Sequence, residues 1–123
     1  MSSQKTSTME KTSINTPDET RKFDKGKVEI SNVGGASIGR FKLDPGWKWS
    51  TSVKPLVKTD SCQQVHTVYV ISGIMRVKMD DGAEQEFGPG DTGFIPAGHD
   101  AWVVGNESMT GVDFTGAKTY TQK

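Results

Sequence analysis

The stretch GDTGFIPAGH, residues 90–99, carries the clearest strand and turn signals of the chain. Its β-forming run at residues 92–95 lies between a Gly-Asp pair and a Pro-Ala-Gly turn, and such residues end strands because they favour turn conformations. Before it lies an apolar strand pair closed by glycines, residues 65–82. Each of the two segments carries one of the two histidines of the chain, His66 and His99. This arrangement predicts a small β-barrel with a pocket inside.

Short segments of period two, separated by turn residues, fill most of the remaining chain. Residues 27–33 and 36–43 alternate around Gly34-Gly35 and predict a hairpin. Further predicted strands are residues 84–87, 101–104 and 109–114. The segment of residues 54–58 contains Pro55, which favours an edge or loop position. Because no stretch keeps a 3.6-residue period, the fold class is predicted to be all-β, a sandwich or barrel with little helix.

Length and charge exclude several classes of function. A chain of 123 residues supports one core. Its 15 basic and 15 acidic residues include no basic run that would follow a phosphate backbone, so no nucleic acid partner is expected. Apolar runs fall far short of the roughly 20 residues that span a bilayer, so no membrane partner is expected either. The polar N-terminus and the single cysteine, Cys62, predict a cytoplasmic protein.

The N-terminal part differs in composition from the rest. Residues 1–22 are rich in Ser, Thr, Lys, Gln and Glu and contain too few apolar side chains to bury a face. They are predicted to form a mobile tail, and residues 23–123 a single barrel domain. Residues 17–20 begin with proline followed by acids, which also suits one helical turn.

The motifs of the barrel segment resemble those of the cupin family. The second cupin motif has the form G-x5-P-x-G-x2-H-x3-N, and Gly90, Pro96 and Gly98 match it in register. The first has the form G-x5-H-x-H-x3-4-E-x6-G, and Gly73 matches its final glycine. The chain is most similar to small stand-alone bacterial cupins without a defined activity. The resemblance implies a double-stranded β-helix (jelly-roll) barrel, usually dimeric, with a metal ion held at its mouth by the motif histidines and glutamate.

The metal-ligand positions of these motifs carry other residues here. Counting back from the final glycine of the first motif puts His66 at the glutamate position and Asp60 and Cys62 at the two histidine positions. In the second motif Ala101 stands at the histidine position, and His99 lies two residues earlier. Residues two apart share a strand face, so His99 is still expected to face the interior. The family's own ligand set is therefore absent.

A different ligand set follows from the chemistry of these residues. In an unbroken extended segment, Asp60, Cys62 and His66 point to one side, and His99 approaches from a neighbouring strand. A carboxylate, a thiolate and two imidazoles suit a divalent transition metal, namely Zn, Fe, Ni or Mn, better than magnesium or calcium. Two alternatives stay open. Cys62 is a small apolar filler while His66 donates to a carbonyl, or Cys62 is a reactive thiol activated by His66.

Apolar and aromatic side chains define the predicted pocket wall. Trp47 and Trp49 share strand parity and follow a Pro-Gly turn, and the resemblance implies that they lie near the barrel mouth. The other side chains predicted to face the interior are Val68, Val70, Phe94, Met75, Val77, Met79, Val112 and Phe114. Asp113, between the last two, is predicted to point outward. An apolar pocket with few polar groups is the usual form of a small-molecule site.

Two functions fit this pattern. The first is a cupin that binds a small molecule through a metal ion held by His66, His99 and Cys62 or Asp60, with or without catalysis. The second is a metal-free binding or regulatory module. No catalytic residue can be assigned from the sequence. A homodimer is also expected, because a jelly-roll edge that exposes Val28, Ile30 and Val33 would invite pairing.

Overall fold

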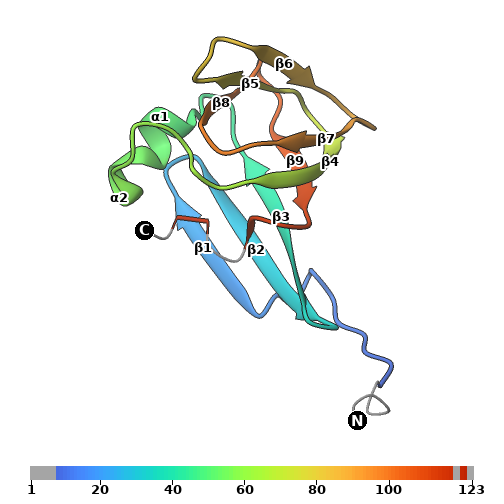
Figure 1. Ribbon diagram of the computed structural model, residues 1–123. Helices are drawn as coiled ribbons and strands as arrows, with labels where there is room; N and C mark the ends of the chain where they lie inside the picture. Colours follow the sequence, from blue (N-terminus) through green and yellow to red (C-terminus); the bar gives the residue numbers. More distant parts are fainter. Residues whose placement is uncertain (1–7, 118–119, 122–123) are drawn as a thin grey trace.

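A computed structural model describes residues 8–117, 120 and 121, and within them the chain forms two antiparallel sheets and two short helices (Figure 1). The predicted all-β class is confirmed. The elements are β1 (Glu19–Phe23), β2 (Gly26–Val33), β3 (Ala36–Leu43), α1 (Trp49–Ser52), α2 (Lys54–Val57), β4 (His66–Ser72), β5 (Met75–Met79), β6 (Glu84–Phe87), β7 (Thr92–Ile95), β8 (His99–Val103) and β9 (Met109–Asp113).

The two sheets are formed by interleaved parts of the chain. Among the described residues, six strands pair in the order β1-β2-β3-β9-β4-β7, and three pair in the order β6-β5-β8. The chain therefore crosses between sheets after β4, β6, β7 and β8. Side chains from both inner faces form one core, which includes Val28, Leu43, Val70, Val77 and Met109.

The β2–β3 hairpin is confirmed in the predicted register. Val33 pairs with Ala36 across a two-residue turn, and Gly34 and Gly35 both have positive φ, 58° and 80°. This is the turn that matches the twist of two antiparallel strands, and glycine adopts it without steric cost.

The N-terminal segment is more ordered than its composition predicts. Strand β1 pairs with β2 along its whole length, so the tail boundary after residue 22 is wrong. No helical turn forms at residues 17–20, because the Asp18 N–H donates to the Ile30 carbonyl (2.9 Å) and continues the ladder. This pairing covers the edge of β2 and leaves Val28 and Ile30 in the core, 0% and 1% exposed. The expectation that they lie on an exposed edge is wrong. Residues 1–7 of the predicted tail lie outside the described residues.

Residues 49–57 form α1 and α2 where the sequence predicts strand or loop. Pro55 occupies the first turn of α2, a position that tolerates proline because its N–H has no intrahelical acceptor. Lys58 then ends α2 with a positive φ of 62°. No helix of the described residues is long and apolar enough to cross a membrane.

Candidate metal centre and apolar cavity

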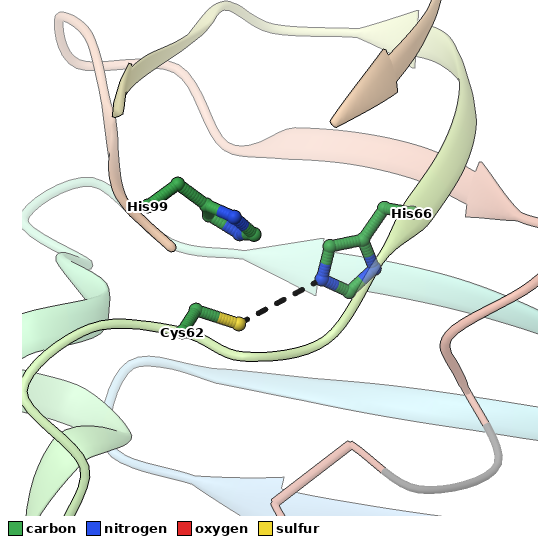
Figure 2. A group of neighbouring side chains, drawn as sticks. All are labelled: Cys62, His66 and His99. Atoms are coloured by element: carbon green, nitrogen blue, oxygen red, sulfur yellow. Dashed lines mark hydrogen bonds between the residues drawn. The ribbon is translucent and has the colours of Figure 1, made fainter. Parts of the chain in front are cut away.

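Cys62, His66 and His99 converge between the two sheets. One potential ligand atom from each lies within 4.8 Å of the others, and all three residues are buried. Figure 2 shows the three side chains pointing toward one another. His66 begins β4 of the larger sheet, His99 begins β8 of the smaller sheet, and Cys62 lies in the segment that leads from α2 to β4. The structure thus brings together three of the four predicted ligands.

Backbone hydrogen bonds fix Cys62 beside the start of β8. The Cys62 N–H donates to the His99 carbonyl, and the Gly98 N–H donates to the Cys62 carbonyl, both at 2.7 Å. The two residues form an isolated antiparallel bridge. The Cys62 Sγ then lies 3.9 Å from His66 Nε2. A tetrahedral zinc site with ordinary bond lengths separates sulfur and nitrogen ligands by about 3.6 Å, so a small adjustment suffices.

Asp60 does not join the cluster. Among the described residues, the group that can hold a metal contains Cys62, His66 and His99 alone. Asp60 is exposed, whereas both of the next two residues, Ser61 and Cys62, are buried. Two consecutive buried side chains show that the segment does not alternate as a strand does. The prediction of Asp60 as a ligand is wrong because it assumed an unbroken strand.

Asp113 fixes the His66 ring through a hydrogen bond at Nδ1, the ring nitrogen that does not face Cys62. Its carboxylate is fully buried (0% exposed), and Oδ2 lies 2.5 Å from His66 Nδ1. The backbone N–H groups of Thr67, Thr115 and Gly116 donate to the other oxygen, Oδ1, at 3.0–3.3 Å. A carboxylate accepts, so His66 donates through Nδ1 and turns Nε2 toward Cys62. The sequence interpretation missed this residue.

The His99 ring is oriented in the same way by the backbone. Its Nδ1 lies 2.7 Å from the carbonyl oxygen of Pro96. Because a carbonyl only accepts, Nδ1 carries a proton, and the neutral ring keeps its lone pair on Nε2. Metal-bound histidines usually donate their second ring N–H to a carboxylate or a backbone carbonyl. Both of these arrangements occur here, one on each histidine.

The charges of the cluster favour a thiolate. Burial raises the pKa of the Cys62 thiol, but the hydrogen bonds and charges of His66 and His99 outweigh it and hold that pKa at about 6. Burial lowers the pKa of His66, but hydrogen bonds with Asp113 and Cys62 raise it to about 9. Burial raises the pKa of Asp113, and the hydrogen bond and charge of His66 lower it below its usual value. A thiolate is the form of cysteine that binds metals.

An apolar cavity of about 480 Å³, part of it open to solvent, lies beside the cluster. Of the side chains predicted to face the interior, Trp47, Trp49, Val68, Met75 and Val112 line it. Val70 is buried but belongs to the surrounding core. Phe94 does not face the cavity, since 64% of it is exposed and Ile95 faces inward in its place. The full lining is Phe41, Leu43, Trp47, Trp49, His66, Val68, Met75, Ile95, His99, Ala101, Met109, Gly111, Val112 and Tyr120.

The inward face of β9 differs from the prediction. Asp113 is buried, and Phe114 is 51% exposed, so the predictions that Asp113 points outward and Phe114 inward are both wrong. The inward residues of the strand are Met109, Gly111 and Asp113. The pairing of Asp113 with His66 compensates for burying its charge.

Tyr120 is a second cavity residue that the sequence interpretation missed. Its ring contacts Phe41 and His66 edge-on or at a tilt, with ring centroids 4.8 and 5.7 Å apart. The Arg21 guanidinium donates to its carbonyl oxygen at 2.7 Å. Burial raises the pKa of the Tyr120 phenol well above its usual value. Trp49 and Tyr120 line both the apolar cavity and a second hollow, which reaches Cys62.

Comparison with known proteins assigns the fold. A protein of unknown function from Rhizobium leguminosarum bv. viciae 3841 is 19% identical, with a TM-score of 0.61 over 89% of this chain and 97% of its own. The polyketide cyclase RemF from Streptomyces resistomycificus is 17% identical, with a TM-score of 0.61 over 89% of this chain and 80% of its own.

A larger enzyme shares the same fold. Oxalate decarboxylase from Lactobacillus farciminis, solved as a formate complex, is 20% identical, with a TM-score of 0.57 over 80% of this chain. The chain spans 31% of that enzyme's length. No curated protein sequence matches the chain. The model of the EutQ-like cupin domain matches residues 52–120, a range that holds the buried cluster and Asp113. The chain therefore belongs to the cupin superfamily and contains a EutQ-like cupin domain.

Proposed function

We propose that the protein binds one divalent transition-metal ion through Cys62 Sγ, His66 Nε2 and His99 Nε2, and that a small molecule in the apolar cavity completes the coordination. The observation that carries this proposal is the orientation of the two rings. Asp113 and the Pro96 carbonyl each accept an Nδ1–H, so Nε2 is the ring atom that each histidine has left to bind a metal, beside a thiol with a lowered pKa. Metal binding releases the Nε2 proton that His66, with its raised pKa, holds at neutral pH.

The donor set fits zinc or iron(II) best. A soft thiolate and two imidazoles disfavour magnesium and calcium, which prefer oxygen ligands. Three protein ligands leave one position of a tetrahedral ion free, as in catalytic rather than structural zinc sites. A metal ion in such a site supplies Lewis acidity to a bound oxygen. His66 and His99 line the cavity, so a cavity ligand can reach the ion.

Metal content tests the proposal directly. Protein purified without a metal-affinity tag is expected to contain about one equivalent of zinc, iron or nickel by elemental analysis, and a chelator is expected to lower its melting temperature. Cys62→Ala and His99→Ala are each expected to lose the stoichiometric metal. Asp60→Ala is the matched control and is expected to retain it, because Asp60 lies outside the cluster. A wild-type protein that takes up no transition metal after reconstitution rejects the proposal.

We propose in addition that the protein is a homodimer, assembled through the outer face of β4, β7 and β9. The exposed apolar side chains in and next to these strands are Val65, Tyr69, Ile71, Phe94 and Phe114. Thr67 pairs with Phe94, and its carbonyl accepts from the Phe114 N–H, so both aromatic residues flank β4. The five exposed side chains, with exposed fractions of 42–64%, together present on the order of 400 Å² of apolar surface. A standard interface buries about 800 Å² per partner, somewhat more than half of it apolar.

A charge placed in this face is expected to separate the dimer. Phe94→Lys buries an ammonium group in the proposed interface, so the mass in solution is expected to fall from dimer to monomer, as measured by light scattering after gel filtration. The matched control is Leu56→Lys, because Leu56 is also exposed (50%, against 64% for Phe94) but lies on α2. A monomeric wild-type protein, or a dimer that survives Phe94→Lys, contradicts this interface.

A further inference from the structure

We propose that the cavity takes a small monocarboxylate with an apolar body and one neutral hydrogen-bond acceptor. This inference rests on the proposed metal site, and it assigns a chemical class to the ligand. Three features of the cavity carry it: the absence of charged side chains in its described lining, the charge at the open metal position, and the unpaired indole N–H of Trp47.

The cavity lining provides no charged partner for a charged group of the ligand away from the metal. Among the described residues that line the cavity, none is Lys, Arg, Asp or Glu. Apart from His66 and His99, the wall consists of aliphatic and aromatic side chains and one glycine, Gly111. A charged group placed against this wall would lose its hydration without gaining a partner. The body of the ligand is therefore apolar, and its charge is confined to the end that meets the metal.

The charge around the metal position limits that head to a single negative charge. A divalent ion with the Cys62 thiolate carries one net positive charge, which attracts a carboxylate to the open position. Asp113, behind His66, already adds one buried negative charge nearby. The ion, the thiolate and Asp113 are neutral together, so a monoanion leaves one net negative charge at the site and a dianion leaves two. The second carboxylate of a dianion finds no cation among the described residues lining the cavity.

The Trp47 ring lies in the cavity wall and carries an unpaired donor. It is 3% exposed and lines the cavity, and its Nε1–H is buried without a hydrogen-bond partner among the described residues. Buried donors are nearly always satisfied, and an exception calls for an explanation such as a missing ligand. A ligand that brings a carbonyl or ether oxygen within reach of Nε1 would satisfy this donor. Because the donor is neutral, the acceptor is neutral as well.

Three small acids of similar size test the inference on protein loaded with Co²⁺. The probes are 4-methylpentanoate, 4-oxopentanoate and the dianion glutarate, measured by isothermal titration calorimetry. Both monocarboxylates are expected to bind at least about tenfold more tightly than glutarate, because its second carboxylate is buried unpaired. They are expected to change the visible spectrum of the bound Co²⁺, and metal-free protein is expected to bind neither.

Trp47→Phe tests the role of the indole N–H. Phenylalanine keeps an aromatic ring but cannot donate, so the affinity for 4-oxopentanoate is expected to fall roughly fivefold, while that for 4-methylpentanoate changes less than about twofold. If Trp47→Phe lowers the affinity for both acids equally, the indole N–H does not bind an acceptor on the ligand.

The wild-type measurements decide the proposal even if the variant does not fold. Glutarate binding as tightly as the monocarboxylates, or no binding of either monocarboxylate to loaded protein, overturns the ligand class and leaves the metal site standing. Failure to load any metal overturns both.

Discussion

Replacing Asp113 by asparagine is expected to destabilise the metal-free protein by about 3–5 kcal/mol, because it leaves one member of a buried charge pair without its partner. The same change is expected to weaken metal binding by about 10- to 100-fold. Asp113 is fully buried and is not itself one of the residues that line the cavity, so the substitution replaces neither a lining side chain nor any of the three ligands.

The loss of metal affinity follows from the tautomer of His66. In the wild-type protein the carboxylate accepts from Nδ1, which directs Nε2 toward Cys62 and leaves it as the atom that exchanges its proton for the metal. The asparagine Oδ1 can still accept from the Thr115 and Gly116 N–H groups that now bond Asp113 Oδ1. Its amide nitrogen then faces His66 Nδ1 as a donor. The ring must carry its proton on Nε2, the atom that the metal needs.

Asp60→Asn is the matched control for this experiment. It removes the same charge from an exposed residue close in sequence to Cys62, and it is expected to change the free energy of unfolding by less than about 0.5 kcal/mol. Urea denaturation of the metal-free proteins and competition with a chromogenic chelator measure the two effects. If Asp113→Asn binds the metal as tightly as Asp60→Asn does, Asp113 does not position His66.

The convergence of Cys62, His66 and His99 could be predicted because motif spacing places them. Counting from Gly73 locates the first two, and side-chain alternation puts His99 on the face of Ala101, which is buried as expected. The error at Asp60 has a physical cause. Spacing fixes positions along the chain, but only backbone hydrogen bonds show that the segment around Cys62 is a loop bridged to His99.

Asp113 and Tyr120 could not be found in this way. In β9 and the residue after it, apolar side chains lie on both parities, so alternation alone assigned Val112 and Phe114 to the interior. A charge between two apolar residues usually points to solvent. Only the position of His66 on the neighbouring strand β4 shows that this charge has a buried partner. Tyr120 lies beyond the last strand, where no periodic pattern exists.

The strands were predictable where turn residues delimit them, and the helices were not. The β2–β3 hairpin is specified by two glycines that need positive φ. Helices α1 and α2 have four residues each, too few to show a 3.6-residue period. Strand β1 is polar and forms because β2 offers an unpaired edge, a tertiary effect that overrides composition.

Replacing Gly73 by alanine is expected to destabilise the protein by about 3–4 kcal/mol, the largest effect of any single methyl group proposed for this chain. Gly73 joins β4 to β5 and so carries the chain from one sheet to the other. Its φ of 76° costs a residue with a Cβ about 1–2 kcal/mol. The added Cβ would also overlap the carbonyl oxygen of Ser108 and approach the Met109 Cα to 2.5 Å. Backbone atoms cannot rotate away as a side chain can, so the overlap costs a further 1–3 kcal/mol or so.

Gly90→Ala separates these two contributions. Gly90 also matches the family motif and has a similar φ of 88°, but an added Cβ there meets nothing within 4 Å. It therefore isolates the backbone cost, and a loss of about 1–2 kcal/mol is expected in urea denaturation at an unchanged m value. The difference between the two variants measures the contact between the β4–β5 turn and the segment entering β9. Equal losses would mean that the turn moves aside, and that the close approach of the backbones at Gly73 does not hold the two sheets together.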